Sequence, residues 1–317
     1  KVNYADAFGS VGVWDALIFN ELRNRGIICP PKRDNTKERK IEGAYVKDPQ
    51  VGMHDWVVSF DLNSLYPHII MQYNMSPETI VNEVQSFDLM KRDNTNGSYQ
   101  SSLEYLLDEN KIDVRPELSM AGTGQFFNRV ERGLFPQLVD KLYNERKEYK
   151  KQMLGVEQRI QDEGSSYELE REVTTLDNKQ MAIKILMNSL YGAMSNEYFR
   201  YYDIRIAEGI TISGQLTIRW AEKHLNKYMN QVLGTDNQDY VIAIDTDSLY
   251  INMGGLVEKA KPKDPVKFLD RVAEEKIEPM LDLAYQQLKD YLNGYDQMMV
   301  MKREVIASKG VWTGKKH

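Results

Sequence analysis

The sequence has almost no cysteine, since Cys29 is the only one among 317 residues. An intramolecular disulfide and a zinc site made from several cysteines are therefore excluded. A nearly cysteine-free composition also favours a reducing compartment. Long hydrophobic runs are missing as well, because no apolar stretch approaches the roughly 18 residues that a membrane-spanning helix needs.

The segment KVNYADAFGS at the start of the sequence lacks a basic stretch followed by an apolar one. We therefore expect no secretory signal and no membrane partner. Internal repeats and low-complexity tracts are missing too. The remaining composition, 42% hydrophobic and 28% charged residues, is typical of globular proteins, and the length predicts two or three packed units. Because the chain starts with lysine and stops in GVWTGKKH, we expect it to be a fragment of a longer protein.

Positive charge is in deficit. The 41 Lys and Arg residues against 47 Asp and Glu residues give a net charge of −6. Nucleic-acid binding needs positive charge beside the phosphates, so this total argues weakly against it. The balance reverses locally, however, because residues 302–317 hold five Lys or Arg and one Glu. The net charge therefore does not exclude a nucleic-acid partner.

The hydrophobic pattern predicts helices and strands without βαβ regularity, which indicates an α+β fold. Residues 31–50 are polar and bounded by prolines, so we expect a linker there. Residues 82–118 give only a weak signal, and two glycines after them predict a hairpin. We expect strands at 56–60, 240–245, 248–253 and 298–307, and helices at 9–25, 136–155, 168–196, 205–231 and 265–292, with a further helix directly after Asp61.

The segment Asp245-Thr246-Asp247-Ser248 lies between two apolar, strand-like runs and predicts a tight hairpin. Two carboxylates at the junction of buried strands are costly to desolvate unless a cation compensates their charge. Mg²⁺ is the natural candidate, because it commonly binds one or two carboxylates together with substrate phosphates. The alternative is an ordinary polar β-turn, since Asp, Thr and Ser are common turn residues.

Asp61 stands at the end of a predicted strand, and a predicted helix begins directly after it. This arrangement places backbone N–H groups near Ser64 and Leu65 beside a carboxylate, which suits a metal-bound polyphosphate. The alternative is that Asp61 or Ser64 simply caps the helix.

A polar face is expected on the helix at 168–196, where Lys184, Asn188 and Tyr191 recur at helical spacing. Arg146 and Lys150 have the same spacing on the preceding helix. Two antiparallel helices would direct these cations toward one volume, as an anion-binding site requires. The alternative is a solvated helix face on which acidic neighbours pair with the lysines. Together, the carboxylates and cations predict phosphoryl transfer with two metal ions.

The segments DLNSLYP (61–67), KILMNSLYG (184–192) and DTDS (245–248) have the order and spacing of the three polymerase motifs of family B DNA polymerases. The sequence resembles that family over about residues 8–317, although only loosely at 82–118. Flanking segments such as NSLYGAMSNEYFRYYD and KGVWTGKK are most similar to the replicative polymerases of T-even-type phages.

The resemblance implies roles for single residues. Asp61 and Asp247 resemble the catalytic, metal-binding carboxylates, and Asp245 resembles a weaker third one. The Leu62 carbonyl and Glu304 complete the implied metal site. The implied nucleotide-binding residues are Ser64, Leu65, Tyr66, Arg146, Lys150, Lys184, Asn188 and Tyr191, with Tyr66 beneath the sugar. The implied DNA contacts are Gly192 beside the nascent base pair and Lys315 and Lys316 at the primer.

The resemblance also implies an antiparallel palm sheet backed by helices, with a helical hairpin inserted as the fingers. The implied parts are an N-terminal helix and linker (1–50), a first palm segment (51–132), the fingers (133–196) and a second palm segment (197–317). No exonuclease motif is found in the sequence, and we expect the thumb to be absent. Two departures from the family pattern are Ile244 and Ala243, which stand where glycine and tyrosine are common before DTD.

The implied function is template-directed DNA synthesis, in which two Mg²⁺ ions, or Mn²⁺ as a substitute, assist attack of a primer 3′-hydroxyl on a deoxynucleoside triphosphate. The implied partners are primer-template DNA, deoxynucleoside triphosphates, a separate thumb or exonuclease polypeptide and a sliding clamp. The implied location is the cytoplasm of an infected bacterium. One alternative is a non-catalytic scaffold, which would be free to lose Asp61 or Asp247. Another is a nucleotide cyclase, which would not need the fingers cations.

Overall fold

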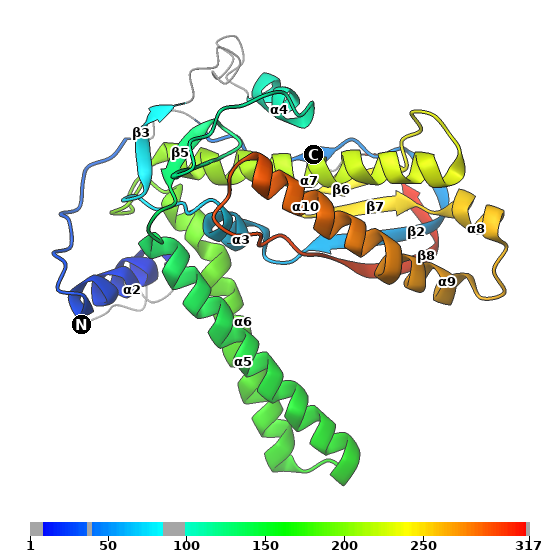
Figure 1. The fold of residues 1–317 in the computed structure, drawn as a ribbon. Coiled ribbons are helices and arrows are strands. Elements are labelled where there is room, and N and C mark those ends of the chain that lie inside the picture. Colours follow the sequence, from blue (N-terminus) through cyan, green and yellow to red (C-terminus); the bar gives the residue numbers. More distant parts are fainter. Residues whose placement is uncertain (1–8, 37–39, 85–98, 315–317) are drawn as a thin grey trace. The chain divides into compact units, whose positions relative to one another are not determined.

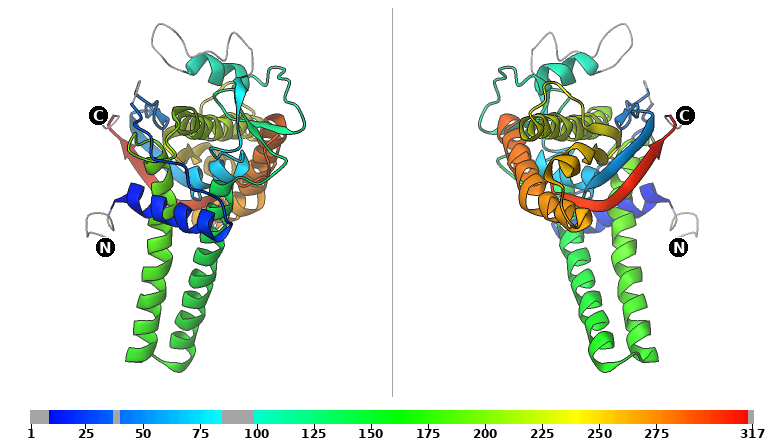
Figure 2. Two further views of the ribbon diagram at one scale, coloured as in Figure 1. Left: turned by 90° about the vertical axis from the view of Figure 1, so that its left-hand side faces the viewer. Right: turned by 90° about the vertical axis from the view of Figure 1, so that its right-hand side faces the viewer.

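The structure is a computed structural model that describes residues 9–36, 40–84 and 99–314. The chain forms two compact units, each assembled from separated segments, and Figures 1 and 2 show their helices and strands. The first unit comprises residues 1–41, 75–78 and 132–207, and the second comprises 42–74, 79–131 and 208–317.

The first unit is helical. It consists of α2 (Ser10–Asn24), α5 (Leu134–Glu163) and α6 (Tyr167–Met194). Helices α5 and α6 run antiparallel, side by side, as the predicted hairpin (Figures 1 and 2). Helix α2 lies against α6, where the fully buried Trp14 donates from its ring nitrogen to the Leu186 carbonyl at 3.2 Å and to Ser189 Oγ at 3.1 Å.

Helix α5 is longer than the predicted helix at 136–155, because Gly155 does not end it. A methyl group at Gly155 would meet nothing within 4 Å, so the glycine occupies an open surface position of the helix. The cost of one glycine in a helix, about 1 kcal/mol, is small beside the packing of the whole helix along α6. The turn is closed by Ser166, whose side chain accepts a hydrogen bond from the Leu169 amide as an N-cap.

The second unit contains an antiparallel five-stranded sheet in the order β1-β6-β7-β2-β8. Its strands are β1 (Val46–Lys47), β2 (Gly52–Leu62), β6 (Val241–Asp245), β7 (Ser248–Asn252) and β8 (Met301–Trp312). The buried residues Val57, Val58 and Phe60 of β2 contribute to its core. Strands β2 and β8 are longer than the predictions at 56–60 and 298–307, because they pair with each other along most of their lengths.

Helices cover one face of this sheet, mainly α7 (Ile204–Leu233) and α10 (Glu278–Tyr291) (Figures 1 and 2). The buried Trp220 of α7 donates from its ring nitrogen to the Ala284 carbonyl of α10 at 2.9 Å. The predicted helix at 265–292 consists of α9 (Pro265–Val272), a π-helical segment (Ala273–Ile277) and α10. The remaining helices of the unit are α3 (Leu65–Gln72), α4 (Gln100–Leu107) and α8 (Gly254–Ala260).

Two strand regions go beyond the predictions. Strand β1 lies inside the predicted linker and pairs with β6, and Lys47 in it forms ion pairs of 2.6 Å with both Glu222 and Asp239. A second sheet of order β3-β5-β4 forms from β3 (Ile80–Val84), β4 (Leu118–Met120) and β5 (Gln125–Asn128). The predicted hairpin joins β4 and β5. Helices and an antiparallel sheet thus confirm the α+β fold, and in the described residues no helix is long and apolar enough to cross a membrane.

Candidate active site

Asp61 lies near the end of β2, the strand that pairs with both β7 and β8. It stands opposite Ser248, the first residue of β7. The Ser248 hydroxyl donates a hydrogen bond of 2.7 Å to Asp61 Oδ2, which fixes the orientation of this half-buried carboxylate. The pairing of β2 with β7 therefore brings two distant parts of the sequence together at one end of the sheet.

The β6–β7 hairpin turn consists of Thr246 and Asp247, as the sequence predicts. Thr246 has a φ of 58°, which is unusual for a β-branched residue and costs on the order of 1–3 kcal/mol. Its amide donates to the Tyr45 carbonyl at 3.0 Å, and the Asp247 amide donates to the Asp245 carbonyl at 2.7 Å. These bonds hold the turn in a conformation that an unsupported polar turn would avoid.

Backbone hydrogen bonds also join this turn to β2. The Leu62 amide donates to the Asp247 carbonyl at 2.9 Å, and the next amide, that of Asn63, donates to the Val300 carbonyl at 3.1 Å. The carboxylates of Asp61 and Asp247 are therefore carried on backbone segments that are tied together directly. Asp245 lies at the end of β6 and is exposed.

The electrostatics of the turn centre on Asp247. Burial, with the negative charges of Asp61, Asp245 and Glu304 added to it, raises the pKa of its carboxyl from the usual 3.8 to about 6. The same four carboxylates, added to burial, raise the pKa of the Tyr250 phenol. We call Asp61, Asp245, Asp247 and Glu304, whose charges act on this one region, the acidic cluster.

Glu304 belongs to this cluster because of an irregularity in β8. The pairing of β2 with β8 shifts register between Val58 and Phe60, which face Ile306 and Arg303, so β8 has one extra residue there. Beside this β-bulge, the hydroxyl of the buried Ser59 accepts a hydrogen bond of 3.0 Å from the Val305 amide. A bulge changes the direction in which the side chains of a strand point. It therefore accounts for the presence of the charged Glu304 side chain in the acidic cluster.

The donor set of the acidic cluster fits Mg²⁺, which prefers oxygen ligands. Within residues 9–36, 40–84 and 99–314, no three His, Cys, Asp or Glu side chains are grouped closely enough to form a metal site by themselves. Mg²⁺ commonly takes only one or two carboxylates and completes its shell with substrate phosphates and water. The crowded pair of Asp61 and Asp247, with the Leu62 carbonyl, suits an ion that binds together with a polyphosphate.

We expect Asp247→Asn to stabilise the metal-free chain by about 1 kcal/mol at pH 7, after allowance for solvent screening of a half-exposed group. Asparagine removes a half-buried negative charge that other carboxylates oppose. The gain should disappear below about pH 4, where Asp247 is protonated in both the folded and the unfolded chain. Urea denaturation with a chelator measures both values, and Asp55→Asn, at an exposed position of β2, is the control. An unchanged or lower stability at pH 7 would contradict this account.

Helix α3 begins directly after the acidic cluster. Its N-cap, Ser64, has left-handed backbone angles, φ 50° and ψ 53°, and its side chain makes no capping hydrogen bond. Ser64 thus occupies the N-cap position, as the alternative interpretation allows, but its side chain does not cap the helix. The Ser64 hydroxyl instead donates a hydrogen bond of 3.3 Å to Asn63 Oδ1. The half-buried Tyr66 lies in the first turn of α3, after the buried Leu65.

The predicted cations lie in the first unit, on α5 and α6. Arg146 of α5 donates from Nε to Oε1 of Gln180 of α6 at 3.2 Å, which fixes the pairing of the two helices. Lys184 and Asn188 follow Gln180 by one and two turns, and both are exposed, as is Lys150. Within the ranges that the structure describes, Lys150 and Lys184 form no ion pair.

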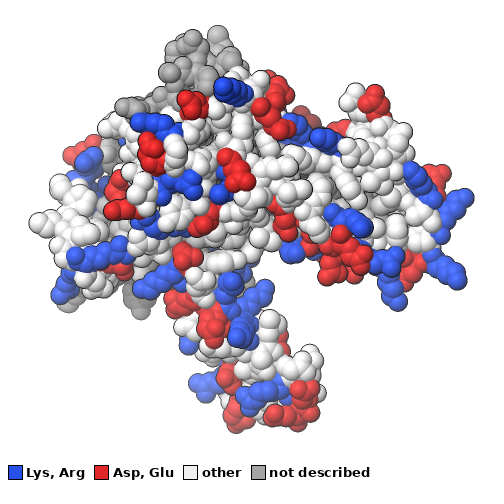
Figure 3. Space-filling view, in the orientation of Figure 1, with Lys and Arg blue, Asp and Glu red and all other residues white. Residues whose placement is uncertain are grey.

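The alternative interpretation is a solvated face on which acidic neighbours pair with the lysines. One such neighbour, Glu148 of α5, accepts a hydrogen bond from Gln152 at 3.0 Å. Figure 3 shows both signs of charge interspersed over the visible face of the hairpin, so the chain has no uniform basic field there. Tyr191 is half-buried, and burial raises the pKa of its phenol. Gly192 is exposed, and Lys315 and Lys316 lie outside the described residues.

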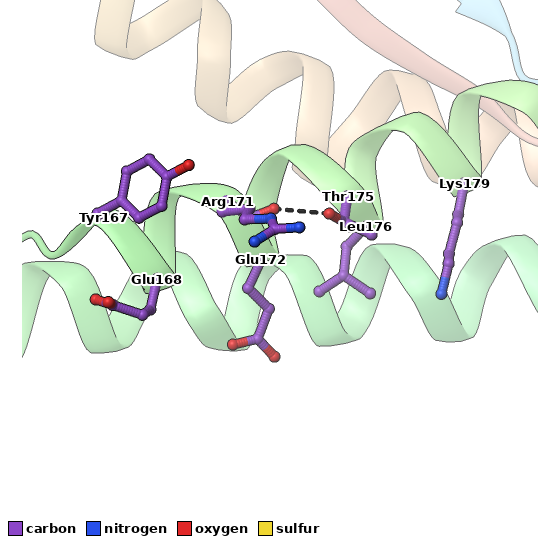
Figure 4. A pocket seen from close by; sticks show the side chains of 7 residues that line it. All are labelled: Tyr167, Glu168, Arg171, Glu172, Thr175, Leu176 and Lys179. Carbon is purple, nitrogen blue, oxygen red and sulfur yellow. Dashed lines mark hydrogen bonds between the residues drawn. The ribbon is translucent and has the colours of Figure 1, made fainter.

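A surface depression of about 480 Å³ lies elsewhere on α6, near the hairpin turn. Figure 4 shows its seven lining side chains, all from that helix, with the Thr175 hydroxyl donating to the Arg171 carbonyl at 2.8 Å. None of the predicted site residues lines it. Its shallow form, on one face of one helix, gives it no evident part in the predicted chemistry.

Sequence reasoning missed two residues of the site, Ser248 as the partner of Asp61 and Tyr250 as the phenol that faces the acidic cluster. A signal for them exists in the run SLYIN, where residues 248, 250 and 252 alternate with buried residues and therefore share one face of β7. A third residue, Ser59, was also missed, because its hydrogen bond with the Val305 amide depends on the register of β2 against β8.

Known proteins with similar sequences are DNA polymerases. A sequence model of DNA polymerase family B matches residues 11–282. The DNA-directed DNA polymerase of Enterobacteria phage T4 is 32% identical over an alignment that covers 100% of this chain and 40% of that protein. For the enzyme of Escherichia phage RB69 the values are 32%, 100% and 39%. DNA polymerase 1 of Pyrococcus abyssi is 29% identical over 88% of this chain and 30% of that protein. The chain thus spans about two fifths of the length of its phage relatives.

Proposed function

This chain belongs to DNA polymerase family B, and on that premise we propose that it carries out template-directed DNA synthesis. The primer 3′-hydroxyl attacks the α-phosphorus of a deoxynucleoside triphosphate, and the bond to pyrophosphate breaks. The acidic cluster carries the proposal, because its four carboxylates place like charges around the half-buried Asp247, and bound cations would compensate them.

In this proposal Asp61, Asp247 and the Leu62 carbonyl hold the metal ions. Bound Mg²⁺, or Mn²⁺ in its place, neutralises phosphate charge and activates the attacking hydroxyl. Ser248 keeps one oxygen of Asp61 in place through its 2.7 Å hydrogen bond. Asp245 and Glu304, which are more exposed, would act as outer carboxylates with smaller effects.

The triphosphate is assigned to groups that carry positive charge or N–H donors. The amides of the first turn of α3, near Ser64 and Leu65, suit phosphate oxygens because the N-terminus of a helix favours anions. Arg146, Lys150 and Lys184 supply positive charge, and Asn188 supplies an amide. Tyr191 and Gly192 are assigned to the nascent base pair, and Lys315 and Lys316 to the primer.

The proposed partners are primer-template DNA and deoxynucleoside triphosphates, together with a separate thumb or exonuclease polypeptide and a sliding clamp. The phage relatives support a bacterial cell infected by a phage as the place of action. The alternative, a non-catalytic scaffold, has no use for a cluster of like charges around the half-buried Asp247, because that cluster opposes folding. The retained acidic cluster therefore favours catalysis.

Primer extension tests the proposal. We propose that the chain alone extends a primer poorly, because duplex affinity grows with the number of phosphates that a protein contacts. Adding a polypeptide that supplies the remaining length of the phage relatives should increase extension. If neither the chain nor the combination incorporates nucleotides with Mg²⁺ or Mn²⁺, the scaffold alternative is favoured.

Tyr66→Ala should admit ribonucleotides at least tenfold more readily relative to deoxyribonucleotides, a change of about 1.4 kcal/mol in discrimination. The physical reason is steric, because a ring beneath the sugar leaves no room for a 2′-hydroxyl. Single-nucleotide incorporation with matched ribonucleotide and deoxyribonucleotide substrates measures the ratio. Tyr66→Phe is the matched control, since it keeps the ring and should keep the ratio. An unchanged ratio for Tyr66→Ala would count against this placement of the sugar.

A further inference from the structure

Gly214 lies in the interior of α7, where glycine destabilises a helix relative to alanine. A packing contact explains its presence. A methyl group built on Gly214 would lie 3.1 Å from Cε1 of Tyr66, closer than carbon atoms normally approach. The same methyl group would lie 3.5 Å from Leu65 and Ile69, which is an ordinary contact distance. The Tyr66 ring therefore rests directly on the backbone of α7.

Helix α7 has little freedom to move away from that ring. The Ser213 hydroxyl accepts a hydrogen bond of 2.9 Å from the Gly122 amide, and Gln215 Nε2 donates one of 2.7 Å to the Gly43 carbonyl. The β4–β5 turn also packs closely here, since a methyl group on Gly122 would lie 3.0 Å from the carbonyl oxygen of Ile212. The contact with Gly214 involves a side-chain atom of Tyr66, Cε1, and a side chain can shift by rotation about its bonds where the anchored backbone of α7 cannot.

We propose that Gly214 is a positioning residue that sets how far the Tyr66 ring stands out from α7, and thereby how strictly the site selects deoxyribose over ribose. This inference rests on the proposed role of Tyr66. A methyl group at Gly214 pushes the ring away from α7. The ring then takes more of the space beneath the sugar, so a 2′-hydroxyl is excluded more strongly.

The first test measures sugar selection for Gly214→Ala in the form of the protein that extends primers. We expect the ratio of deoxyribonucleotide to ribonucleotide incorporation efficiency to rise about fivefold or more. In the Tyr66→Ala background the same substitution should leave the ratio unchanged, because the ring is gone. Gly155→Ala, at an open helical position, is the matched control and should not alter the ratio. An unchanged or lower ratio for Gly214→Ala would overturn the inference.

The second test measures the contact itself by thermal unfolding of the chain. In the Tyr66→Ala background, Gly214→Ala should raise the melting temperature by about 2–4 °C, because alanine favours the helix and nothing opposes it. With Tyr66 present the rise should be smaller or reversed. Equal shifts in both backgrounds would show that the ring and the methyl group do not interact.

The two proposals fail in different ways. If Tyr66→Ala changes sugar selection but Gly214→Ala does not, only the role of Gly214 is refuted. If Tyr66→Ala itself leaves sugar selection unchanged, the proposed placement of the sugar is refuted, and the role of Gly214 with it, whatever the melting temperatures show about the contact.

Discussion

Alanine in place of Asp61 or Asp247 is expected to lower the rate of nucleotide incorporation at least a thousandfold, about 4 kcal/mol in the activation barrier. The two carboxylates lie on backbone segments joined by the 2.9 Å hydrogen bond from the Leu62 amide to the Asp247 carbonyl. One remaining carboxylate of the pair cannot hold two metal ions against a triphosphate, so neither the hydroxyl nor the leaving group is stabilised.

Single-turnover incorporation at saturating nucleotide and Mg²⁺ measures this loss, with primer-template binding measured in parallel. Asp245→Ala is the matched control within the same turn, because Asp245 is exposed and should have a milder effect. Retention of more than about a tenth of the parent rate by either Asp61→Ala or Asp247→Ala would refute the assignment of the metal ligands.

Removing a cation of the α5–α6 hairpin should have the next largest effect. We expect Lys184→Ala and Arg146→Ala each to lower the efficiency of nucleotide incorporation by about 10- to 100-fold, since a charge-assisted contact contributes roughly 1.5–3 kcal/mol. Primer-template affinity should stay near the parent value, because these groups are assigned to the triphosphate. Lys184 is available for such a contact, since it is exposed and forms no ion pair within the described residues.

The control is Lys151→Ala, which removes an exposed cation on the same helix as Arg146 but on a different face. It should change neither quantity much. Pre-steady-state incorporation gives the nucleotide affinity and the maximal rate, and a gel-shift titration gives the DNA affinity. An equal loss of DNA affinity in the Lys184 and Arg146 variants would mean that the hairpin holds DNA.

Local patterns predicted the parts of the site that depend on local structure. The hairpin at Asp245–Ser248 follows from two apolar runs around turn residues, and the helical hairpin follows from periodicity. The lengths of β2 and β8 and the existence of β1 did not follow, because each depends on pairing with a distant strand. The contact of Ser59 with β8 was hidden for the same reason, since register is a tertiary property.

Local sequence patterns also did not show which helices pack together in the first unit. Trp14 joins α2 to α6 through contacts with residues more than 170 positions away, of which Ser189 is 175 positions away. Nothing in the residues around Trp14 indicates its partner. Sequence spacing placed Arg146, Lys150, Lys184 and Asn188 on helix faces, whereas the hydrogen bond of Arg146 to Gln180 was needed to set how the two helices align.

The position of β2 in its sheet has a consequence for synthesis on the ribosome. Its partners β7 and β8 both come later in the chain, and Ser248 is 187 residues beyond Asp61, the residue it pairs with. At roughly 5–20 residues per second, a strand of apolar residues waits about 10–40 s for its first neighbour. An unpaired apolar strand is a template for aggregation, so β2 stays exposed to wrong pairing throughout the interval before β7 emerges.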